Sequence, residues 1–472
     1  MNNPYNNITR RDFAQKVALA TGAASFGLTN TVMANYHPFL LKSPLSIGRY
    51  KTAFEREPLI HSYGFKGGYI TRLWQVVTQL TDDSGKQTIG LGIQSPLWSD
   101  SKMTSIWGES GSNSVMYNLT CRALQLIEGQ SFDTPIQMIE DILDEVHAYG
   151  ANISNCGDLR KTFALNALTS LDNAAWLLYA KQNNISSFID LIPTDYKAAF
   201  SYQNKEIASI PSISYSTSDA DIEKLGDEGY FFIKIKIGSP GSQQEMLEKD
   251  MRRMQLIHNI LGSGQANVDG ERKIVYYMDA NGRYESKDAL RRLLDHCKKI
   301  GAFDQIAIVE EPFPESFDED VSDLGVRIAA DESAHTDREA LKRIEMGYTG
   351  IALKPMGKTL SMTLKIAKLA HDRNVPCFCT DLTVNPVLVD WNKSIAARLK
   401  PFPGQNVGLL ETNGPQNYKN WESMIGYHPR GKAPWNQAQK GLFVLGEDFY
   451  AESGGMFLDL EHYRNLFANQ SN

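Results

Sequence analysis

Three acidic residues stand directly behind three short apolar segments, and this placement could bring their carboxylates together. They are Asp279, Glu310 and Asp331, separated by 31 and 21 residues, which leaves room for one helix and its loops in each interval. If the apolar segments are parallel strands of a barrel, their C-terminal ends meet at one mouth, where catalytic residues of barrels sit. The alternative is that each acid caps the next helix or begins a turn, as Asp and Glu often do.

Three carboxylates at one mouth would repel one another unless a cation lies among them. A hard divalent ion prefers oxygen ligands, and magnesium retains open positions for the oxygens of a substrate. We therefore predict a Mg²⁺ site at these three acids, with Mn²⁺ as the alternative ion.

Three lysines also fall at the ends of predicted strands. In the segment Lys234-Ile235-Lys236 the two-residue period of a strand places both lysines on one face. Such a face is commonly solvated, but the neighbouring predicted strands read as buried on both sides, so we expect both lysines inside the barrel. Lys354 ends a later apolar segment, on the opposite side of the barrel from Lys236.

A lysine acts as a base only when its amine is neutral. Burial and a neighbouring ammonium both lower the pKa of a lysine, so Lys234 is expected to lower the pKa of Lys236. A metal ion would lower it further, hold the carboxylate of a substrate and stabilise the negative charge that develops when an α-proton leaves. These residues therefore predict proton abstraction alpha to a carboxylate.

After residue 210 the sequence alternates short apolar segments with amphipathic ones, which predicts alternating strands and helices. Eight strands in this order indicate a parallel sheet closed into a barrel. An open doubly wound sheet is the rival, although no G-x-G-x-x-G motif follows its first strand. The expected strands are 210–215, 230–237, 273–278, 305–309, 326–330, 350–353, 375–379 and 408–410, and the expected helices are 243–260, 286–300, 337–346, 360–374 and 386–399.

Upstream of these strands the pattern predicts a small α+β unit. Residues 70–80 alternate like a strand, 81–86 carry the residues of a turn, and 87–93 read as the returning strand. Helical spacing of apolar residues covers 114–128 and 135–149. A further helix over 162–182 is apolar nearly all round, so we expect it to be buried between the two units.

The first 34 residues resemble an export signal. Arg10 and Arg11 precede an uncharged stretch at 17–28, and small residues surround 32–34. The stretch is too short to span a bilayer, which needs about 20 residues, and the adjacent arginines are typical of twin-arginine signals. The alternative is a terminus with a chance arginine pair. We expect residues 1–34 to engage the twin-arginine export machinery and to direct the protein to the periplasm or otherwise outside the cytoplasm.

The composition sets further limits. The chain has 472 residues and a formal net charge of −7, which argues against broad binding of nucleic acids. Five cysteines in a chain of this length do not make a disulfide framework. Cys377 and Cys379 form a C-x-C pair inside an apolar run, and two small buried residues are the preferred interpretation over a metal site.

The order and spacing of the strand-end motifs resemble the mandelate racemase and muconate lactonizing enzyme branch of the enolase superfamily, over about residues 59–413. The resemblance implies a modified TIM barrel, (β/α)7β, with an N-terminal α+β capping domain. It places the cap at 35–165, the barrel at 166–435 and a C-terminal segment, packing back on the cap, at 436–472. The motifs that carry it are Lys234-Ile-Lys236, Asp279-Ala-Asn281, Glu310-Glu-Pro312, Asp331-Glu-Ser333 and Leu353-Lys354-Pro355.

The resemblance also implies a role for each of these residues. Enzymes of this superfamily use a Lys or His base together with magnesium and an enediolate. The implied bases are Lys236 and Lys354, on opposite faces of the substrate, with Lys234 beside them. Glu332 competes with Asp331 for the third metal position. The implied metal ligands are Asp279, Glu310 and Asp331.

Two lysines that face each other suit racemisation or epimerisation, here of an amino acid or a dipeptide-like substrate. Dipeptide epimerases of the family carry Asp-x-Asp after the last strand to hold the substrate ammonium. In this chain the place reads Glu411-Thr412-Asn413, so Glu411 could hold an ammonium but the second acid is missing. Residues 62–68, with glycines as hinges, are the expected lid. The implied substrate-binding residues are Lys66, Asn281, Glu332, Asp381, Glu411 and Asn413.

Three other functions compete with racemisation. A β-elimination, either dehydration of an acid sugar or a reaction of the o-succinylbenzoate synthase type, would use the same enolate. A metal hydrolase on an ordinary barrel is disfavoured by the near absence of His at strand ends. An exported binding protein with a retired site would have no need to keep these charges together. The expected partner is a small-molecule carboxylate, and a homo-oligomer is left open.

Overall fold

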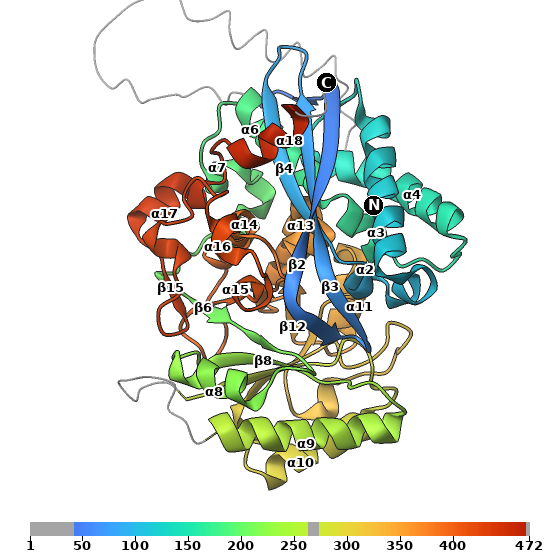
Figure 1. Cartoon of the computed structure of the whole chain (residues 1–472), viewed down its shortest axis with the longest axis vertical. Coiled ribbons are helices and arrows are strands. Elements are labelled where there is room, and N and C mark those ends of the chain that lie inside the picture. The colour runs from blue at the N-terminus through green and yellow to red at the C-terminus, as the bar shows by residue number, and fades with distance from the viewer. Residues whose placement is uncertain (1–41, 263–272, 469–472) are drawn as a thin grey trace, which may run out of the picture. The chain divides into compact units, whose positions relative to one another are not determined.

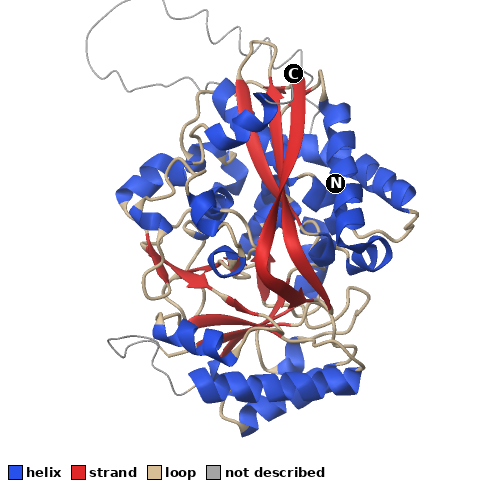
Figure 2. Ribbon diagram, in the orientation of Figure 1, coloured by secondary structure: helices blue, strands red, loops and turns tan. Residues whose placement is uncertain are grey.

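The computed structural model describes residues 42–262 and 273–468, shown in Figures 1 and 2. The predicted export signal at 1–34 lies outside the described residues. Within the described ranges, no helix combines the length and the apolar character needed to cross a membrane.

The central element is a closed sheet of parallel strands, and its first strand is split in two. β6 (Glu206–Ile210) pairs with the last barrel strand and β7 (Ser212–Ile213) pairs with the second, so together they close the ring. The break is at Pro211, which has no N–H for the ladder. This closure confirms the predicted barrel over an open sheet. The remaining barrel strands are β8 (Phe232–Lys236), β9 (Val275–Asp279), β10 (Ile306–Glu310), β11 (Ile328–Ala330), β12 (Gly350–Leu353), β13 (Cys377–Cys379) and β14 (Gly408–Glu411).

Helices cover the outside of the barrel, as the apolar periodicity predicts. The connection between β10 and β11 is the exception in the described chain, because its helical part is a short 3₁₀ turn at Ser322–Leu324. Two prolines and many acids in this connection disfavour an α-helix. The α-helices of the other connections are α8 (Asp219–Asp227), α9 (Gln243–Leu261), α10 (Lys287–Lys299), α11 (Asp337–Glu345), α13 (Leu360–Asp372) and α14 (Pro386–Ala396).

The N-terminal unit is an antiparallel sheet with helices against it. Its strands are long, and two of them agree with the predicted hairpin. The first strand is not among the predicted elements, because Pro58 and several charges interrupt its alternation and the pairing shifts register after Pro58. The unit comprises β2 (Arg49–Phe65), β3 (Gly68–Thr81), β4 (Gln87–Gln94), α3 (Ser101–Ile127) and α4 (Pro135–Ser154).

The turn between β2 and β3 brings one predicted site residue to the barrel. Phe65 pairs with Gly68, so the loop has only two residues, Lys66 and Gly67. Both have positive φ, 51° and 74°, as a type I′ hairpin turn requires. The tip of this hairpin reaches the loops at the barrel mouth (Figure 1).

The helix predicted over 162–182 forms as two helices, α5 (Lys161–Ala167) and α6 (Thr169–Gln182), with a break at Leu168. α6 is buried on nearly every side, as predicted. α6 packs directly on the cap sheet because β4 has a glycine, Gly90, where the two elements meet. A Cβ at Gly90 would stand 2.2 Å from the backbone nitrogen of Ala174.

The C-terminal elements divide between the two units: β15 (Leu442–Val444) pairs with β6 of the barrel, and the last described helix contacts the cap sheet. α18 (Glu461–Ala468) holds His462, whose ring stacks on Tyr427 with centroids 3.5 Å apart. The Nε2 atom of His462 lies 3.0 Å from the carboxylate of Glu55 on β2. A side-chain contact therefore ties the last described helix to the first long strand.

Candidate active site

The three predicted acids meet at the C-terminal ends of neighbouring strands. Asp279 is the last residue of β9 and Glu310 the last of β10, and these two residues pair in register. Asp331 directly follows β11. All three are fully buried. As the sequence predicts, the position of each acid at the end of a strand brings the three acids together at one mouth of the barrel.

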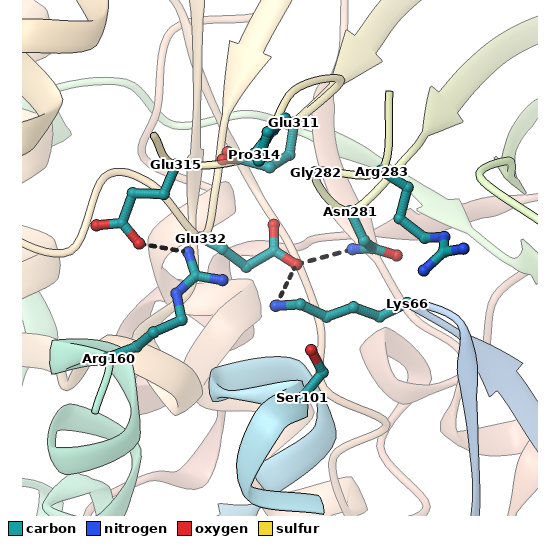
Figure 3. Close-up of a pocket in the computed structure, with 10 residues that line it drawn as sticks. All are labelled: Lys66, Ser101, Arg160, Asn281, Gly282, Arg283, Glu311, Pro314, Glu315 and Glu332. Atoms are coloured by element: carbon teal, nitrogen blue, oxygen red, sulfur yellow. Dashed lines mark hydrogen bonds and ion pairs between the residues drawn. The ribbon is translucent and has the colours of Figure 1, made fainter. Parts of the chain in front are cut away.

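Glu332 links this mouth to the cap (Figure 3). Its Oε1 accepts a hydrogen bond of 2.9 Å from Asn281 Nδ2 and lies 3.5 Å from Lys66 Nζ. Lys66 also donates to the backbone oxygen of Trp98 at 2.5 Å. The hairpin tip is thus held against the barrel by a lysine that contacts both units.

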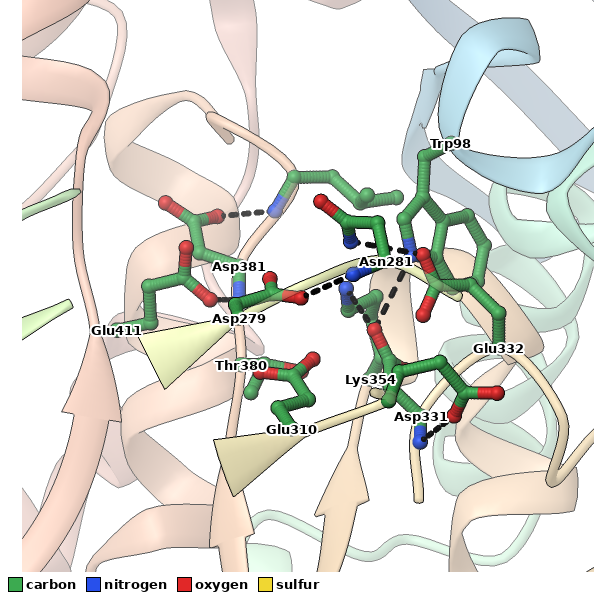
Figure 4. Close-up of polar contacts among 12 residues, drawn as sticks. Trp98, Asp279, Asn281, Glu310, Asp331, Glu332, Lys354, Thr380, Asp381 and Glu411 are labelled. Carbon is green, nitrogen blue, oxygen red and sulfur yellow. Dashed lines mark hydrogen bonds and ion pairs between the residues drawn. The ribbon is translucent and has the colours of Figure 1, made fainter. Parts of the chain in front are cut away.

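Three carboxylates form a group that could hold a metal ion (Figure 4). One ligand oxygen from each of Glu310, Asp331 and Glu332 lies within 4.8 Å of the others. Each of these residues also has a buried oxygen without a hydrogen-bond partner: Glu310 Oε1, Asp331 Oδ1 and Glu332 Oε2. Buried polar atoms are normally satisfied, and an all-oxygen donor set suits a hard divalent cation. The residues therefore fit the metal that the resemblance implies.

Asp279 lies beside lysines rather than inside this group. Its Oδ2 lies 2.9 Å from Lys234 Nζ and 2.5 Å from Lys236 Nζ. Its Oδ1 accepts from the backbone N–H of Asn281 at 3.0 Å. Burial alone would raise the pKa of this carboxyl, but the two ammonium groups outweigh burial and hold the pKa well below its usual range.

Lys234 lies among three carboxylates. Its Nζ lies 3.0 Å from Glu310 Oε2 and 3.0 Å from Glu411 Oε2, besides its contact with Asp279. Burial opposes the charge, but these three carboxylates outweigh it and raise the pKa of Lys234 well above the usual value. Asp279 Oδ2 therefore lies between the two ammonium groups of Lys234 and Lys236.

The two predicted bases, Lys236 and Lys354, contact different acids. Lys236 Nζ donates to Asp279 and, at 3.1 Å, to Asn281 Oδ1. Lys354 Nζ donates to Asp331 Oδ2 at 2.5 Å. Burial opposes the charge of Lys354, but Asp331 and Glu310 outweigh it, so its pKa is raised.

Asp331 has two further contacts, with Lys358 and with Trp98, that are not among the predicted site residues. Lys358 Nζ donates to the backbone oxygen of Asp331 at 2.6 Å and lies 3.2 Å from its Oδ1. Trp98 Nε1 donates to Asp331 Oδ2 at 3.1 Å. Lys358 stands one helical turn after Lys354, which is a signal that could have found it. Trp98 comes from the cap, and nothing in its local sequence points to the barrel.

Three of the residues expected to bind the substrate lie together at the ends of β13 and β14, and Glu411 among them is the one expected to hold an ammonium. Glu411 Oε2 accepts from Lys234 and from the backbone N–H of Asp381 at 3.1 Å. Its Oε1 accepts from Asn413 Nδ2 at 3.1 Å. Both Glu411 oxygens therefore have donors already, whereas Asn413 Oδ1 is buried without a partner. Burial and the charge of Glu411 raise the pKa of Asp381 to about 7.

The fold and the strand-end residues define a capped barrel with an acidic mouth. Residues 219–406 match the family model described as enolase C-terminal domain-like. No curated protein matches the sequence. The model match supports the resemblance to the enolase superfamily over these residues, and solved structures of that superfamily share the fold.

Solved structures with this fold include named racemases and epimerases. A mandelate racemase/muconate lactonizing protein from Herpetosiphon aurantiacus has a TM-score of 0.57 at 15% identity, covering 86% of this chain and 97% of that chain. The L-Ala-D/L-Glu epimerase from Bacillus subtilis has a TM-score of 0.57 at 18% identity, covering 79% and 91%. An N-succinyl Arg/Lys racemase from Bacillus cereus has a TM-score of 0.54 at 15% identity, covering 79% and 89%. At these identities the likeness establishes the fold.

Proposed function

We propose that this protein is an isomerase, a racemase or epimerase that moves the proton on the carbon alpha to a carboxylate. The substrate class is an amino acid or a dipeptide-like molecule. The observation that carries the proposal is the pair of buried lysines, Lys236 and Lys354, at the acids of one barrel mouth. β8 and β12, which supply them, stand four strands apart in a ring of eight. The two amines therefore approach the mouth from across the barrel.

The chain's own groups suit a two-base reaction. One lysine, as a neutral amine, takes the α-proton as the C–H bond breaks, and the electron pair passes into an enediolate. The other, as an ammonium, returns a proton to the opposite face. The raised pKa of Lys354 favours the ammonium form in which it would donate. In the reverse direction the two lysines exchange roles.

The proposal includes a divalent metal, which we take to be Mg²⁺. Glu310 and Asp331 are the proposed ligands with buried oxygens that accept no hydrogen bond, and Asp279 is the third ligand that the resemblance implies. When bound, the ion would polarise the substrate carboxylate and stabilise the enediolate charge. The lysine contacts of Asp279 keep that carboxylate ionised and therefore able to ligate.

The test is proton exchange in D₂O with a library of dipeptides and N-acylated amino acids. Lys354→Ala should stop turnover while Lys236 still exchanges the α-proton of one epimer with solvent, and Lys236→Ala should show the mirror behaviour. Each loss of turnover should reach ~10²–10⁴-fold, as expected of a general base. Lys368→Ala, on the exposed side of α13 and paired with Asp372, is the control and should keep full activity. Full turnover in either site variant would mean a one-base reaction and would favour β-elimination.

We also propose export through the twin-arginine machinery, on the basis of Arg10, Arg11 and the stretch behind them. Replacing both arginines by lysine should leave the precursor uncleaved in the cytoplasm, as fractionation and immunoblotting would detect. Normal export of that variant would make the arginine pair incidental.

A further inference from the structure

Two of the lysines at the barrel mouth have an aromatic ring of the cap against their amine. Nζ of Lys354 lies 4.5 Å from the centroid of the Trp98 ring, and Nζ of Lys236 lies 5.4 Å from that of the Phe65 ring. An ammonium within about 6 Å of a ring centroid is attracted to the face of the ring. All four side chains are buried. Because these two lysines are the proposed bases, each base has a ring of its own.

Trp98 contacts both members of the ion pair formed by Lys354 and Asp331 (Figure 4). Its ring lies against the ammonium, while its Nε1 donates at 3.1 Å to Asp331 Oδ2, the same oxygen to which Lys354 donates. Gly357 makes this approach possible, because a Cβ there would stand 2.8 Å from the indole ring and 3.0 Å from Cδ of Lys354. The indole therefore limits where the amine can lie relative to the carboxylate.

Hydrogen bonds hold the backbone around Trp98 in place. The residue lies in α2 (Pro96–Ser99), a single turn that follows β4. The backbone oxygen of Trp98 accepts from Lys66 Nζ at 2.5 Å, and that of Ser99 accepts from Thr162 Oγ1 at 2.7 Å. A side chain can position a reacting group only when its own support is fixed. The turn of α2 meets this condition.

The two rings of the cap differ from another aromatic ring at the mouth. Lys234, the lysine beside the bases, lies 4.6 Å from the ring centroid of Tyr277, which belongs to the barrel itself. The cavity of about 190 Å³ at the junction of cap and barrel is lined by other residues, Glu315 among them, and not by Phe65 or Trp98 (Figure 3). These two rings pack on the amines, which favours a role in placing the bases.

We propose that Trp98 is a positioning residue for Lys354, and that Phe65 positions Lys236 in the same way. A displacement of about 1 Å in a reacting geometry can cost ~10²-fold in rate, so a ring that confines an amine contributes to the rate of proton transfer. The inference rests on the proposed function and adds that the cap places the two bases separately. Loss of one ring should therefore impair the proton transfer of one epimer and spare that of the other.

Initial rates of α-proton exchange in D₂O with Mg²⁺ present, measured for each epimer separately, test the inference. The epimer that Lys354 deprotonates is the one whose exchange is lost in Lys354→Ala. Trp98→Leu should slow the exchange of that epimer by ~10²-fold and leave the other within about twofold of the wild type. Trp98→Phe keeps a ring and loses the N–H, so its loss should be smaller. Phe65→Leu should show the mirror pattern.

The matched control is Trp176→Phe, which removes an indole N–H from another buried position where the cap meets the barrel. Trp176 lies on α6, and its Nε1 donates at 3.0 Å to Ser361 Oγ at the start of α13. This variant should keep the wild-type ratio of the two exchange rates. Equal losses for both epimers in Trp98→Leu, or no loss at all, would overturn the inference, because a merely structural role of the indole affects both epimers alike.

A second measurement needs no turnover. In protein labelled with ¹³C at the lysine ε-carbons and loaded with Mg²⁺, a ring against the amine displaces the ε-carbon and ε-proton resonances through its ring current. Trp98→Leu should move the Lys354 resonance, identified by its absence in Lys354→Arg, and leave the Lys236 resonance in place. An unmoved Lys354 resonance would also overturn the inference. If the wild type exchanges no α-proton, the proposed function fails, and the resonances still decide whether Trp98 places the amine.

Discussion

Asp331 illustrates how the site keeps buried charge in balance. Two lysines and an indole N–H contact it, and the two ammonium groups hold its pKa well below the usual range in spite of burial. One of its oxygens nevertheless has no hydrogen bond. A carboxylate that is ionised, fixed in place and incompletely satisfied has the properties of a metal ligand.

Two residues, Asp279 and Glu332, are candidates for the third metal ligand. The resemblance implies Asp279, whereas the group of unpartnered oxygens contains Glu332. We expect Glu310→Gln, Asp331→Asn and Asp279→Asn each to lose most of the Mg²⁺ affinity measured by calorimetry. Glu332→Gln should lose less, because Asn281 and Lys66 already share its charge.

Glu315→Gln, which removes an acid from the cavity rim, is the matched control and should bind Mg²⁺ normally. Circular dichroism of each variant would establish that the barrel remains folded. If Glu332→Gln lost more affinity than Asp279→Asn, the third ligand would move to Glu332.

The residue types at the strand ends could be predicted, but most of their partners could not. Asp279, Glu310, Asp331 and the lysines follow apolar runs, and the barrel geometry then dictates that they meet. The contacts of Trp98 with Asp331 and of Arg283 with the hairpin join segments that are far apart in sequence, so no local pattern encodes them.

The turn after β12 shows how one element positions two lysines. α12 (Pro355–Lys358) places Lys354 at its N-cap and Lys358 at its end, and both point to Asp331. The helix stops at Thr359, whose φ of 72° and ψ of 155° lie in a region that is essentially restricted to glycine. The site is therefore held by a locally strained turn.

Thr359→Gly should make the protein more stable. Relief of the strain is worth about 1–3 kcal/mol, while a glycine N-cap loses a few tenths and the freer unfolded chain costs ~0.4–1 kcal/mol. We expect a net gain of about 1 kcal/mol in the free energy of unfolding by urea. Thr359→Ala keeps most of the strain and loses the cap to Met362 N–H, so it should be destabilised by ~1 kcal/mol. A destabilised glycine variant would show that the turn is not strained.

Elements whose apolar residues recur with a clear period could be predicted from the sequence. Elements that mix apolar residues with charges and proline could not. α10 buries Leu290, Leu293, Leu294 and Cys297 along one stripe, the 3.6-residue period expected of a surface helix. β2 mixes exposed charges with Pro58, and only its pairing with β3 over most of its length makes it a strand. Tertiary pairing overrides local propensity there.

At the scale of the whole molecule, the cap and the barrel meet through buried polar contacts. The hairpin tip contacts Glu332, and Trp98 reaches Asp331 because Gly357 has no side chain, where a Cβ would stand 2.8 Å from the indole ring. Deeper in the junction, Asp172 of α6 accepts from the hydroxyl and the backbone N–H of Ser361 at the start of α13. The site therefore depends on how two units fit, which the sequence of neither unit reveals alone.

Asp172 makes the stability of this junction depend on pH. Burial raises its pKa from 3.8 to about 7, although the hydrogen bonds from Ser361 oppose the rise. Between these two values the folded protein holds a proton that the unfolded chain has released. Stability is therefore highest below about pH 4, as far as this group is concerned, and falls by about 1.4 kcal/mol per unit as the pH rises toward 7.

Asp172→Asn removes the titration while keeping the shape of the side chain, so its effect should change with pH. We expect the free energy of unfolding of the variant, measured in urea relative to the wild type, to increase as the pH rises from 5 to 8. This trend is expected even if the variant is the less stable protein at pH 5. Asp141→Asn, an exposed position on α4, is the control and should give a difference that does not vary with pH. A constant difference for Asp172→Asn would mean that the carboxylate stays ionised in the folded protein. The hydrogen bonds from Ser361 would then have outweighed the cost of burial, and the junction would rest on a buried anion.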